Sequence, residues 1–436
     1  MSNWQKVKIG DFLFERKGRY KPNYEQIVNL PRIEKIDFGG NFHIGNKDSK
    51  TDMILIKDGD LVISGINVAK GAIGIYSGED VTATIHYSSY TFDSNKINVE
   101  YFKRFLKSSE FIELLNEQVK GGIKTEIKPK HILPLEIQLP DINTQAQIVQ
   151  HFENVEDDIA DVTKEVLKQE SLLKKLKQTI LQEAIEGKLT AKYRAKNPDI
   201  GTAKKLLEQI KTEKEKLIKE KKIRPSKPLS PINEDEIPFD IPPSWEWCRL
   251  GDIANGFQYG TSTKSKINGR VPVLRMGNIQ NGRVLLEELV YTDNESEIEK
   301  YSIEYNDLLF NRTNSRELVG KTAIYSFQEK AIYAGYLIKY SMILSNSHYI
   351  NYVMNSPFHY QWCAKVRSDA IGQSNINATK LQSYIVPLPP LEEQKEIVAT
   401  IEKLFTLCNE LESEINQNKT TVDNLMVTVL KESFEN

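Results

Sequence analysis

One spacing constrains this chain more than any other feature of its sequence. Through residues 147–187, apolar side chains recur in alternating steps of four and three, at Ile148, Phe152, Val155, Ile159, Val162, Val166, Leu173, Leu176 and Ile180. The same alternation runs from residue 396 to the C-terminus, at Ile397, Ile401, Leu404, Cys408, Leu411, Ile415, Val422, Leu425 and Val429. This heptad spacing predicts two long helices, each of which needs another helix to cover its apolar seam.

The two seams are related by a single offset. Their first residues give 397 − 148 = 249, and their last give 429 − 180 = 249. Each seam has one polar interruption, Gln169 and Asn418, again 249 apart. A polar residue in a seam costs stability and fixes register. The shared offset favours an internal duplication over two unrelated amphipathic core helices. We therefore expect an antiparallel pair about a pseudo-two-fold axis, with Gln169 and Asn418 close to that axis.

The chain outside the helices also repeats. Trp245-Glu-Trp-Cys-Arg-Leu-Gly-Asp-Ile matches Trp4-Gln-Lys-Val-Lys-Ile-Gly-Asp-Phe at an offset of 251 − 10 = 241, and Asp307 matches Asp60 at 247. The prolines of 224–244 indicate an extended linker. With 436 residues, two or more domains are expected. The predicted segments are a first mixed domain over 1–140, a long helix over 141–187, a basic helix and linker over 188–244, a second mixed domain over 245–390 and a second long helix over 391–436.

The fold class expected is α+β, with two similar mixed domains and an antiparallel coiled coil. In the first domain, apolar runs predict strands over 53–56, 60–63, 72–76 and 135–139 and one helix over 99–118. The first long helix should be capped near Asn143 or Thr144 and end at Gly187.

Several function classes are disfavoured. No apolar run approaches the ~20 residues of a membrane span, and the N-terminus lacks the apolar core of a signal peptide. Three dispersed cysteines suggest neither disulfides nor zinc, so a cytoplasmic protein is expected. No phosphate-binding glycine motif, metal-ligand spacing or catalytic constellation is present. The basic segment 204–224 is interpreted as a solvated helix face, with phosphate or acidic-partner contacts as the alternative.

Two related domains on a helical spacer suit a long, repetitive ligand, and duplex DNA with two half-sites fits this description. Their loops carry Arg, Lys, Asn, Gln, Ser and Thr, the residue types that bind base edges and phosphates. The candidates in the first domain are Lys17, Arg19, Lys21, Asn67, Lys70, Lys124 and Thr125. Those in the second are Gln258, Tyr259, Thr261, Thr263, Lys264, Arg275, Asn278, Arg312, Asn314, Arg316, Gln373 and Asn375.

Over essentially its whole length the chain resembles the specificity subunits of type I restriction-modification systems. The resemblance rests on the Trp245 segment, on Pro387-Leu-Pro-Pro-Leu-Glu-Glu-Gln-Lys-Glu-Ile-Val, and on Ala184-Ile-Glu-Gly-Lys-Leu-Thr, the most specific of the three. Two further segments, Ala203-Lys-Lys-Leu-Leu-Glu-Gln-Ile-Lys-Thr-Glu-Lys and Lys219-Glu-Lys-Lys-Ile, follow in the same order. The first copy departs from the family pattern at Leu139-Pro-Asp-Ile-Asn-Thr-Gln.

The resemblance implies two target-recognition domains that each recognise half of a bipartite DNA target, with the helices as a spacer. It implies two adenine-methyltransferase subunits and restriction (translocase) subunits as partners. S-adenosylmethionine, ATP and magnesium would be bound by those partners, and this chain would be non-catalytic. The competing hypotheses are a DNA-modifying enzyme with an unrecognised active site and a purely structural coiled-coil scaffold.

Overall fold

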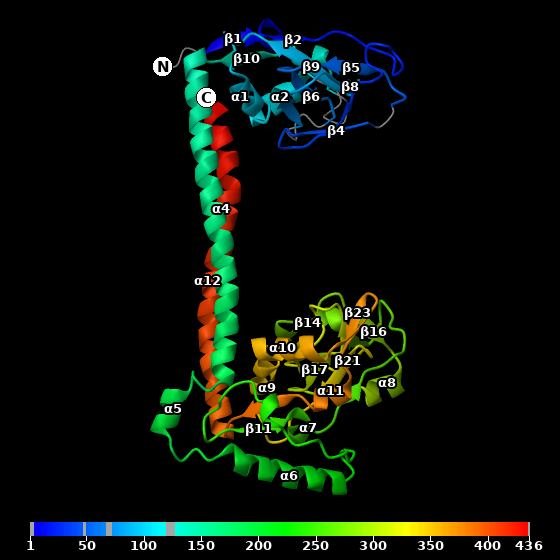
Figure 1. Ribbon diagram of the computed structural model, residues 1–436, viewed down its shortest axis with the longest axis vertical. Coiled ribbons are helices and arrows are strands. Elements are labelled where there is room, and N and C mark those ends of the chain that lie inside the picture. Colours follow the sequence, from blue (N-terminus) through cyan, green and yellow to red (C-terminus); the bar gives the residue numbers. More distant parts are fainter. Residues whose placement is uncertain (1–3, 47–48, 67–71, 119–126, 435–436) are drawn as a thin grey trace. The chain divides into compact units, whose positions relative to one another are not determined.

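The computed structural model describes residues 4–46, 49–66, 72–118 and 127–434 (Figure 1). These residues divide into two compact units. The first contains residues up to 168 together with 415–436, and the second contains 169–414. Each unit therefore holds one mixed domain with one end of each long helix. No helix in the described ranges is long and apolar enough to cross a membrane.

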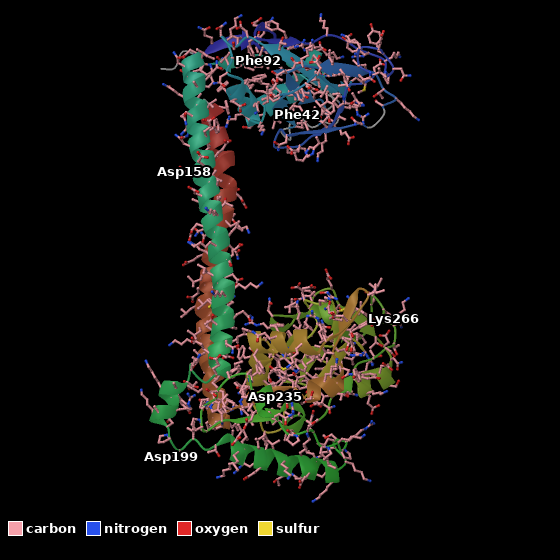
Figure 2. All side chains as sticks on the ribbon, viewed as in Figure 1. Phe42, Phe92, Asp158, Asp199, Asp235 and Lys266 are labelled. Carbon is pink, nitrogen blue, oxygen red and sulfur yellow. The ribbon has the colours of Figure 1, made fainter. Side chains whose placement is uncertain are left out.

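The first unit contains three small sheets. The strands are β1 (Gln5–Lys8), β2 (Leu13–Glu15), β3 (Arg32–Ile36), β4 (Phe42–Gly45), β5 (Met53–Ile56), β6 (Leu61–Ser64), β7 (Ile73–Ile75), β8 (Val81–Thr84), β9 (Tyr87–Phe92) and β10 (Glu136–Leu139). They pair in the orders β1-β10, β2-β9-β6-β7 and β4-β3-β8-β5. The helices are α1 (Val99–Phe105), α2 (Ser109–Gln118) and α3 (Pro129–Ile132). Phe42, labelled in Figure 2, packs edge-on against Tyr76, with ring centroids 5.4 Å apart.

The helix expected over 99–118 is two helices, so that prediction was wrong in one respect. Ser108 lies at the break, where its hydroxyl donates to the carbonyl oxygen of Phe105 and accepts the backbone N–H of Phe111. A serine that bonds the backbone on both sides ends one helix and caps the next. The apolar stripe continues across the break because α1 and α2 pack on the same core.

The second unit repeats this plan with more elements. Its strands are β11 (Glu246–Arg249), β12 (Gln258–Tyr259), β13 (Val271–Leu274), β14 (Ile279–Gln280), β15 (Gly282–Val284), β16 (Val290–Thr292), β17 (Leu308–Asn311), β18 (Thr313–Asn314), β19 (Thr322–Ile324), β20 (Ile332–Tyr333), β21 (Leu337–Tyr340), β22 (Ser368–Ala370), β23 (Gln373–Asn375) and β24 (Ile385–Leu388). Its short helices are α5 (Ala191–Lys196), α6 (Ala203–Lys219), α7 (Leu250–Ile253), α8 (Glu295–Lys300), α9 (Ser347–Val353), α10 (Pro357–Val366) and α11 (Ala378–Gln382). The largest sheet has the order β12-β21-β17-β19-β15-β14.

The two long helices are α4 (Ile142–Ile185) and α12 (Leu391–Phe434). Asp141 caps α4 by accepting the N–H groups of Asn143 and Thr144, so the cap lies two to three residues before the predicted positions. At the other end Gly187 has φ +72°, and N–H groups of Gly187 and Lys188 bond the carbonyls of Ala184 and Glu183. This is a Schellman motif, which confirms the predicted glycine stop.

The helices pair antiparallel within each unit (Figure 1). In the first unit Phe152 of α4 stacks on Phe434 at the end of α12, with ring centroids 5.7 Å apart. In the second, the Lys177 ammonium lies 2.7 Å from the Glu412 carboxylate and 3.2 Å from the Asn409 side-chain oxygen. The first half of α12 therefore packs beside the end of α4, and the end of α12 packs beside the start of α4.

One row of each seam is more buried than the other. Phe152, Val166, Leu173 and Ile180 are buried, whereas Val162 and Leu176, which lie on the other row of the seam, are 47% and 43% exposed. The same holds on α12, where Cys408 and Ile415 are buried but Leu411 is 46% exposed. Gln169 is half-buried and Asn418 is exposed. Two helices bury one row of each seam and leave part of the second row in solvent.

Candidate nucleic-acid interface

Many candidate residues of the second unit meet at the turn between β20 and β21. The N–H of Thr261 donates to the Tyr333 carbonyl (2.9 Å), and the N–H of Gly335 donates to the Thr261 carbonyl (2.7 Å). The N–H of Arg312 donates to the carbonyl of Tyr336 on the same turn (3.0 Å). Segments that lie about 25 to 75 residues apart in the sequence are thus held together by backbone hydrogen bonds.

Arg275 joins the same group because the N–H of Ala334 donates to the carbonyl of Leu274, the preceding residue (2.9 Å). Arg275 is exposed, and its Nη2 donates to the carbonyl of Glu288 (2.8 Å). We refer to Tyr259, Thr261, Arg275, Arg312 and Tyr336 as the Gly335 cluster.

Arg312 is the best-placed side chain of the cluster for contact with DNA. Its guanidinium lies 4.7 Å from the ring centre of Tyr259, a cation–π arrangement. Tyr259 is itself held, since its hydroxyl accepts the backbone N–H of Ala378 (2.9 Å). Nη1 of Arg312 makes one long hydrogen bond to the Gly335 carbonyl (3.4 Å), and within the described residues its buried Nε has no partner. A guanidinium that is oriented by an aromatic face suits a guanine edge or a phosphate.

The loops around Asn314 and Gln373, which the sequence analysis selected separately, form one surface. In the antiparallel pairing of β18 with β23, Thr313 pairs with Asn375 and Asn314 pairs with Ser374. The Asn375 amide donates to the Thr313 hydroxyl (2.7 Å), while Gln373 is exposed. The N–H of Ile376 donates to the carbonyl of Arg312, which joins this surface to the Gly335 cluster.

Three candidates have structural hydrogen bonds that occupy their side chains. The Asn278 side chain is 4% exposed, and its amide donates to the carbonyls of Leu285 and Glu287. Gln258 donates to the Lys300 carbonyl and accepts from the Tyr333 hydroxyl. Thr261 is buried, and its hydroxyl oxygen accepts the N–H of Thr263. In this arrangement these side chains shape the loops, so a base contact would require each of them to give up these bonds.

Thr263 and Lys264 lie on the loop after β12, and both are exposed. Lys266, farther along this loop and labelled in Figure 2, pairs with Asp293 (3.1 Å). Arg316 is exposed on the loop after β18 and bonds the carboxylate of Asp369 (3.1 Å). These cations surround the cluster on adjacent loops.

Fewer candidates can be placed in the first unit. Lys17 and Arg19 are exposed on the segment after β2, and Lys21 lies 3.4 Å from Asp52. Asn67, Lys70, Lys124 and Thr125 lie outside the described residues.

A buried carboxylate fixes the start of the central strand in both units. Asp60 accepts two hydrogen bonds from the Arg16 guanidinium, at 2.6 and 2.7 Å, and one from the Ser89 hydroxyl. Hydrogen bonding to Asp60 raises the pKa of Arg16. The equivalent Asp307 bonds Ser341 and lies 3.3 Å from Lys339. These ion pairs position the strand that leads into each candidate surface.

The backbone frame of the Gly335 cluster recurs in the first unit with different side chains. The N–H of Gly65 donates to the His86 carbonyl and the N–H of Ile127 donates to the Gly65 carbonyl. Arg312 makes the same two bonds, to Tyr336 and from Ile376. Gly65 therefore stands where the second unit has Arg312, and the two units present different chemistry on one scaffold.

The sequence analysis missed Tyr336, Arg367 and Asp369. Tyr336 is 51% exposed beside Arg312, and Asp369 holds both Arg316 and Arg367. The signal available for Tyr336 was an aromatic residue next to a glycine in a turn, which many loops share. In the described ranges, no group of three or more His, Cys, Asp or Glu residues could hold a metal ion.

Known proteins share both the sequence pattern and the fold. The family model for the type I restriction modification DNA specificity domain matches residues 242–418. The type I restriction enzyme EcoAI specificity subunit of Escherichia coli is 28% identical, over 90% of this chain and 75% of that protein. The StySPI specificity subunit of Salmonella potsdam is 23% identical over 94% of this chain and 83% of its own length. The EcoEI specificity subunit of Escherichia coli is 29% identical over 58% of this chain, but the match spans less than half of that protein, 43%.

Two solved structures have the same architecture. One chain comes from a study of complex assembly and conformational transition in the type I R-M system, with a TM-score of 0.67 and 16% identity over 99% of this chain and 97% of that one. The other is the HsdS subunit from Thermoanaerobacter tengcongensis, with a TM-score of 0.56 and 16% identity over 99% and 96% of the two chains. Residues 242–418 match the type I restriction modification DNA specificity domain, and over most of its length the chain is similar in sequence and fold to specificity subunits of type I restriction-modification systems.

Proposed function

We propose that this chain directs a type I complex to a bipartite DNA target, with one half-site recognised by each unit. The observation that supports this most is the repeated backbone frame with Gly65 in one copy and Arg312 in the other. Equivalent scaffolds with unlike side chains are suited to two half-sites of unlike sequence. Asn314, Gln373 and Asn375 would add amide contacts beside Arg312.

The helices would space the two half-sites. Each has 44 residues, which corresponds to about 66 Å at ~1.5 Å per residue. Because the α4 residues on either side of Gln169 belong to different units, the same helix that carries one recognition domain continues into the other.

Exposed leucines on the seam and beside it would bind the partner subunits. Leu172 and Leu176 on α4 are 54% and 43% exposed, and Leu407 and Leu411 on α12 are 51% and 46% exposed. Apolar rows left open by a helix pair are covered in larger bundles by further helices. We infer that two adenine-methyltransferase subunits dock here and that restriction subunits join the resulting complex. The chain itself would be non-catalytic, with S-adenosylmethionine, ATP and magnesium bound by those partners.

Methylation mapping tests this function directly. Genomic adenine methylation would be sequenced in strains with the gene, without it, and with Arg312→Ala. Loss of one bipartite motif on deletion is expected, together with relaxation of only the half recognised by the second unit in the variant. If methylation is unchanged on deletion, the chain does not direct a methyltransferase. If purified chain alone methylates or cleaves DNA, the enzyme hypothesis replaces the proposal.

A further inference from the structure

A β-hairpin beside the Gly335 cluster presents one fully exposed isoleucine. Ala370 of β22 pairs with Gln373 of β23, so the connecting loop has only two residues, Ile371 and Gly372. Gly372 has φ +78°, a conformation that suits glycine in a tight turn, and a Cβ atom added there would meet nothing within 4 Å. The Ile371 side chain is 105% exposed. The tip therefore projects clear of the rest of its unit.

The base of this hairpin is held by a charged network. The Asp369 carboxylate accepts the Ser374 hydroxyl at 2.6 Å, the Arg316 Nε at 3.1 Å and the Arg367 Nε at 3.2 Å. The hydrogen bond from Ser374, followed by the charges of the two arginines, holds the pKa of Asp369 below its usual value. Because both strands and the adjoining loop share one carboxylate, the base of the hairpin is held together within the chain itself.

Basic and amide groups surround the hairpin. Lys380 donates to the carbonyl of Val366 and to the Ser368 hydroxyl, at the start of β22. Arg316 and Arg367 lie at the level of Asp369, and Gln373 and Asn375 project from β23. Glu317 is the nearest acidic neighbour along the Arg316 loop. A hydrogen bond from its own backbone N–H, followed by one from Ser315, lowers its pKa, and the charges of Arg367 and Arg316 add to this. An apolar tip above this set of groups matches a nucleic-acid groove better than an apolar protein surface.

We propose that Ile371 is a wedge that enters the duplex at the second half-site and partly unstacks one base step. This inference rests on the proposed DNA recognition and adds a mode of contact to it. A single exposed apolar residue is ordinary on a protein surface. Here it occupies the tip of a hairpin whose base carries cations, next to Gln373 and Asn375, which are proposed to contact bases. Apolar side chains inserted in this way kink a duplex and are repaid by the extra contacts that the bend allows.

A wedge has a consequence for specificity. Pyrimidine–purine steps unstack most easily, so the second half-site should favour such a step at the position of Ile371. No hydrogen bond to a base edge is needed for that preference.

Local unstacking can be measured with 2-aminopurine. The probe is a duplex that carries the target found by methylation mapping, with 2-aminopurine placed in turn at each adenine of the second half-site. On binding the full-length chain, fluorescence should rise at one position. Ile371→Ala should abolish that rise and weaken binding about tenfold, whereas Ile371→Phe should retain the rise. Ile267→Ala is the matched control, because Ile267 is a second exposed isoleucine (83%) on a loop outside the hairpin.

The outcomes separate the wedge from the wider proposal. Equal fluorescence profiles for the wild type and Ile371→Ala would overturn the wedge while leaving DNA recognition in place. Failure of the wild type to bind the mapped duplex would remove the proposed recognition as well. If Ile371→Ala prevents assembly with the methyltransferase subunits but leaves the fluorescence rise unchanged, the tip contacts a protein and the wedge is wrong. Circular dichroism of each variant provides the folding control.

Discussion

Gln145 and Gln394, 249 residues apart, make the same pair of hydrogen bonds in the two units. The side-chain oxygen of Gln145 accepts the N–H of Asn98 (2.7 Å), and its amide donates to the carbonyl of Pro140 (2.8 Å). Gln394 accepts the N–H of Asn346 (2.8 Å) and donates to the carbonyl of Pro389 (2.9 Å). Both side chains are completely buried. Each glutamine joins a long helix to the helix that follows the last strand of the central sheet.

This relationship predicts separate effects on the two units. Gln394→Ala leaves a buried N–H and a buried carbonyl unpaired, and should destabilise the second unit by about 2–4 kcal/mol. Gln145→Ala should do the same to the first. Hydrogen exchange would show faster opening of α9 and α10 in Gln394→Ala and faster opening of α1 in Gln145→Ala. Gln150→Ala is the control, because Gln150 is exposed and its side-chain amide donates to the nearby side chain of Asn154. Accelerated exchange in both units of one variant would contradict independent junctions.

Arg312→Ala should weaken recognition of the second half-site alone. The guanidinium is oriented by the Tyr259 ring, so the loss should be about 1–3 kcal/mol, or roughly tenfold to a hundredfold in affinity. Binding would be measured with duplexes in which only one half-site is mutated. Arg270→Ala serves as the control because Arg270 is an exposed cation paired with Glu295. An equal loss on both half-sites would argue against one recognition surface per unit.

Gly260→Ala should displace the Gly335 cluster without touching a candidate side chain. A Cβ atom at Gly260 would lie 2.2 Å from the Tyr333 carbonyl oxygen and 2.4 Å from that of Ala334. The turn that holds Thr261 and Arg312 would have to move, so DNA affinity should fall at least as far as in Arg312→Ala. Gly277→Ala, where nothing lies within 4 Å of the added carbon, should bind normally. Fluorescence anisotropy on the same duplexes measures both variants.

The sequence predicted the long helices and the duplication because helical periodicity leaves a constant offset. It named four of the five members of the Gly335 cluster, but it could not predict that their backbone frame recurs in the first unit, because the offset differs between the segments that build it. Gly65 corresponds to Arg312 at 312 − 65 = 247, whereas His86 corresponds to Tyr336 at 336 − 86 = 250. Loop insertions of a few residues hide such pairs from a fixed-offset comparison. For Asn278 the sequence shows an amide in a polar loop, and it could not predict that this amide donates to the carbonyls of Leu285 and Glu287.

Acid should destabilise the second unit through His359. Burial lowers the pKa of His359 from its ordinary value of 6.5 to about 4. Below pH 6.5 the unfolded chain binds a proton at this histidine that the folded chain does not bind. The free energy of unfolding is therefore unaffected by His359 above that pH and falls as the pH is lowered toward 4. The loss should approach about 3 kcal/mol. Hydrogen exchange of α10 between pH 7 and pH 4 measures it. His359→Gln should flatten this dependence, while His348→Gln, at a half-buried histidine, should not.

A disulfide can test whether Gln169 and Asn418 lie together near the pseudo-two-fold axis. Gln169 is eight residues before Lys177, and Asn418 is nine after Asn409, the hydrogen-bond partner of Lys177. Starting instead from the Phe152 and Phe434 pair, Gln169 is seventeen residues onward and Asn418 sixteen back. If the helix pair continues with one register along its length, both routes would bring the two residues opposite each other. Gln169→Cys with Asn418→Cys should therefore oxidise to an intramolecular bond and change mobility in a non-reducing denaturing gel.

The matched control for this crosslink combines Gln169→Cys with Asn409→Cys. Position 409 is about 13 Å from position 418 along α12, at ~1.5 Å per residue. That pair should remain reduced. The natural cysteines, Cys248, Cys363 and Cys408, are buried and do not compete. Oxidation of the control pair in place of the predicted pair would mean that the register shifts between the two ends of the helices. A shift would change the spacing imposed on the two half-sites, since each register step of one heptad moves a recognition domain by about 10 Å along the axis.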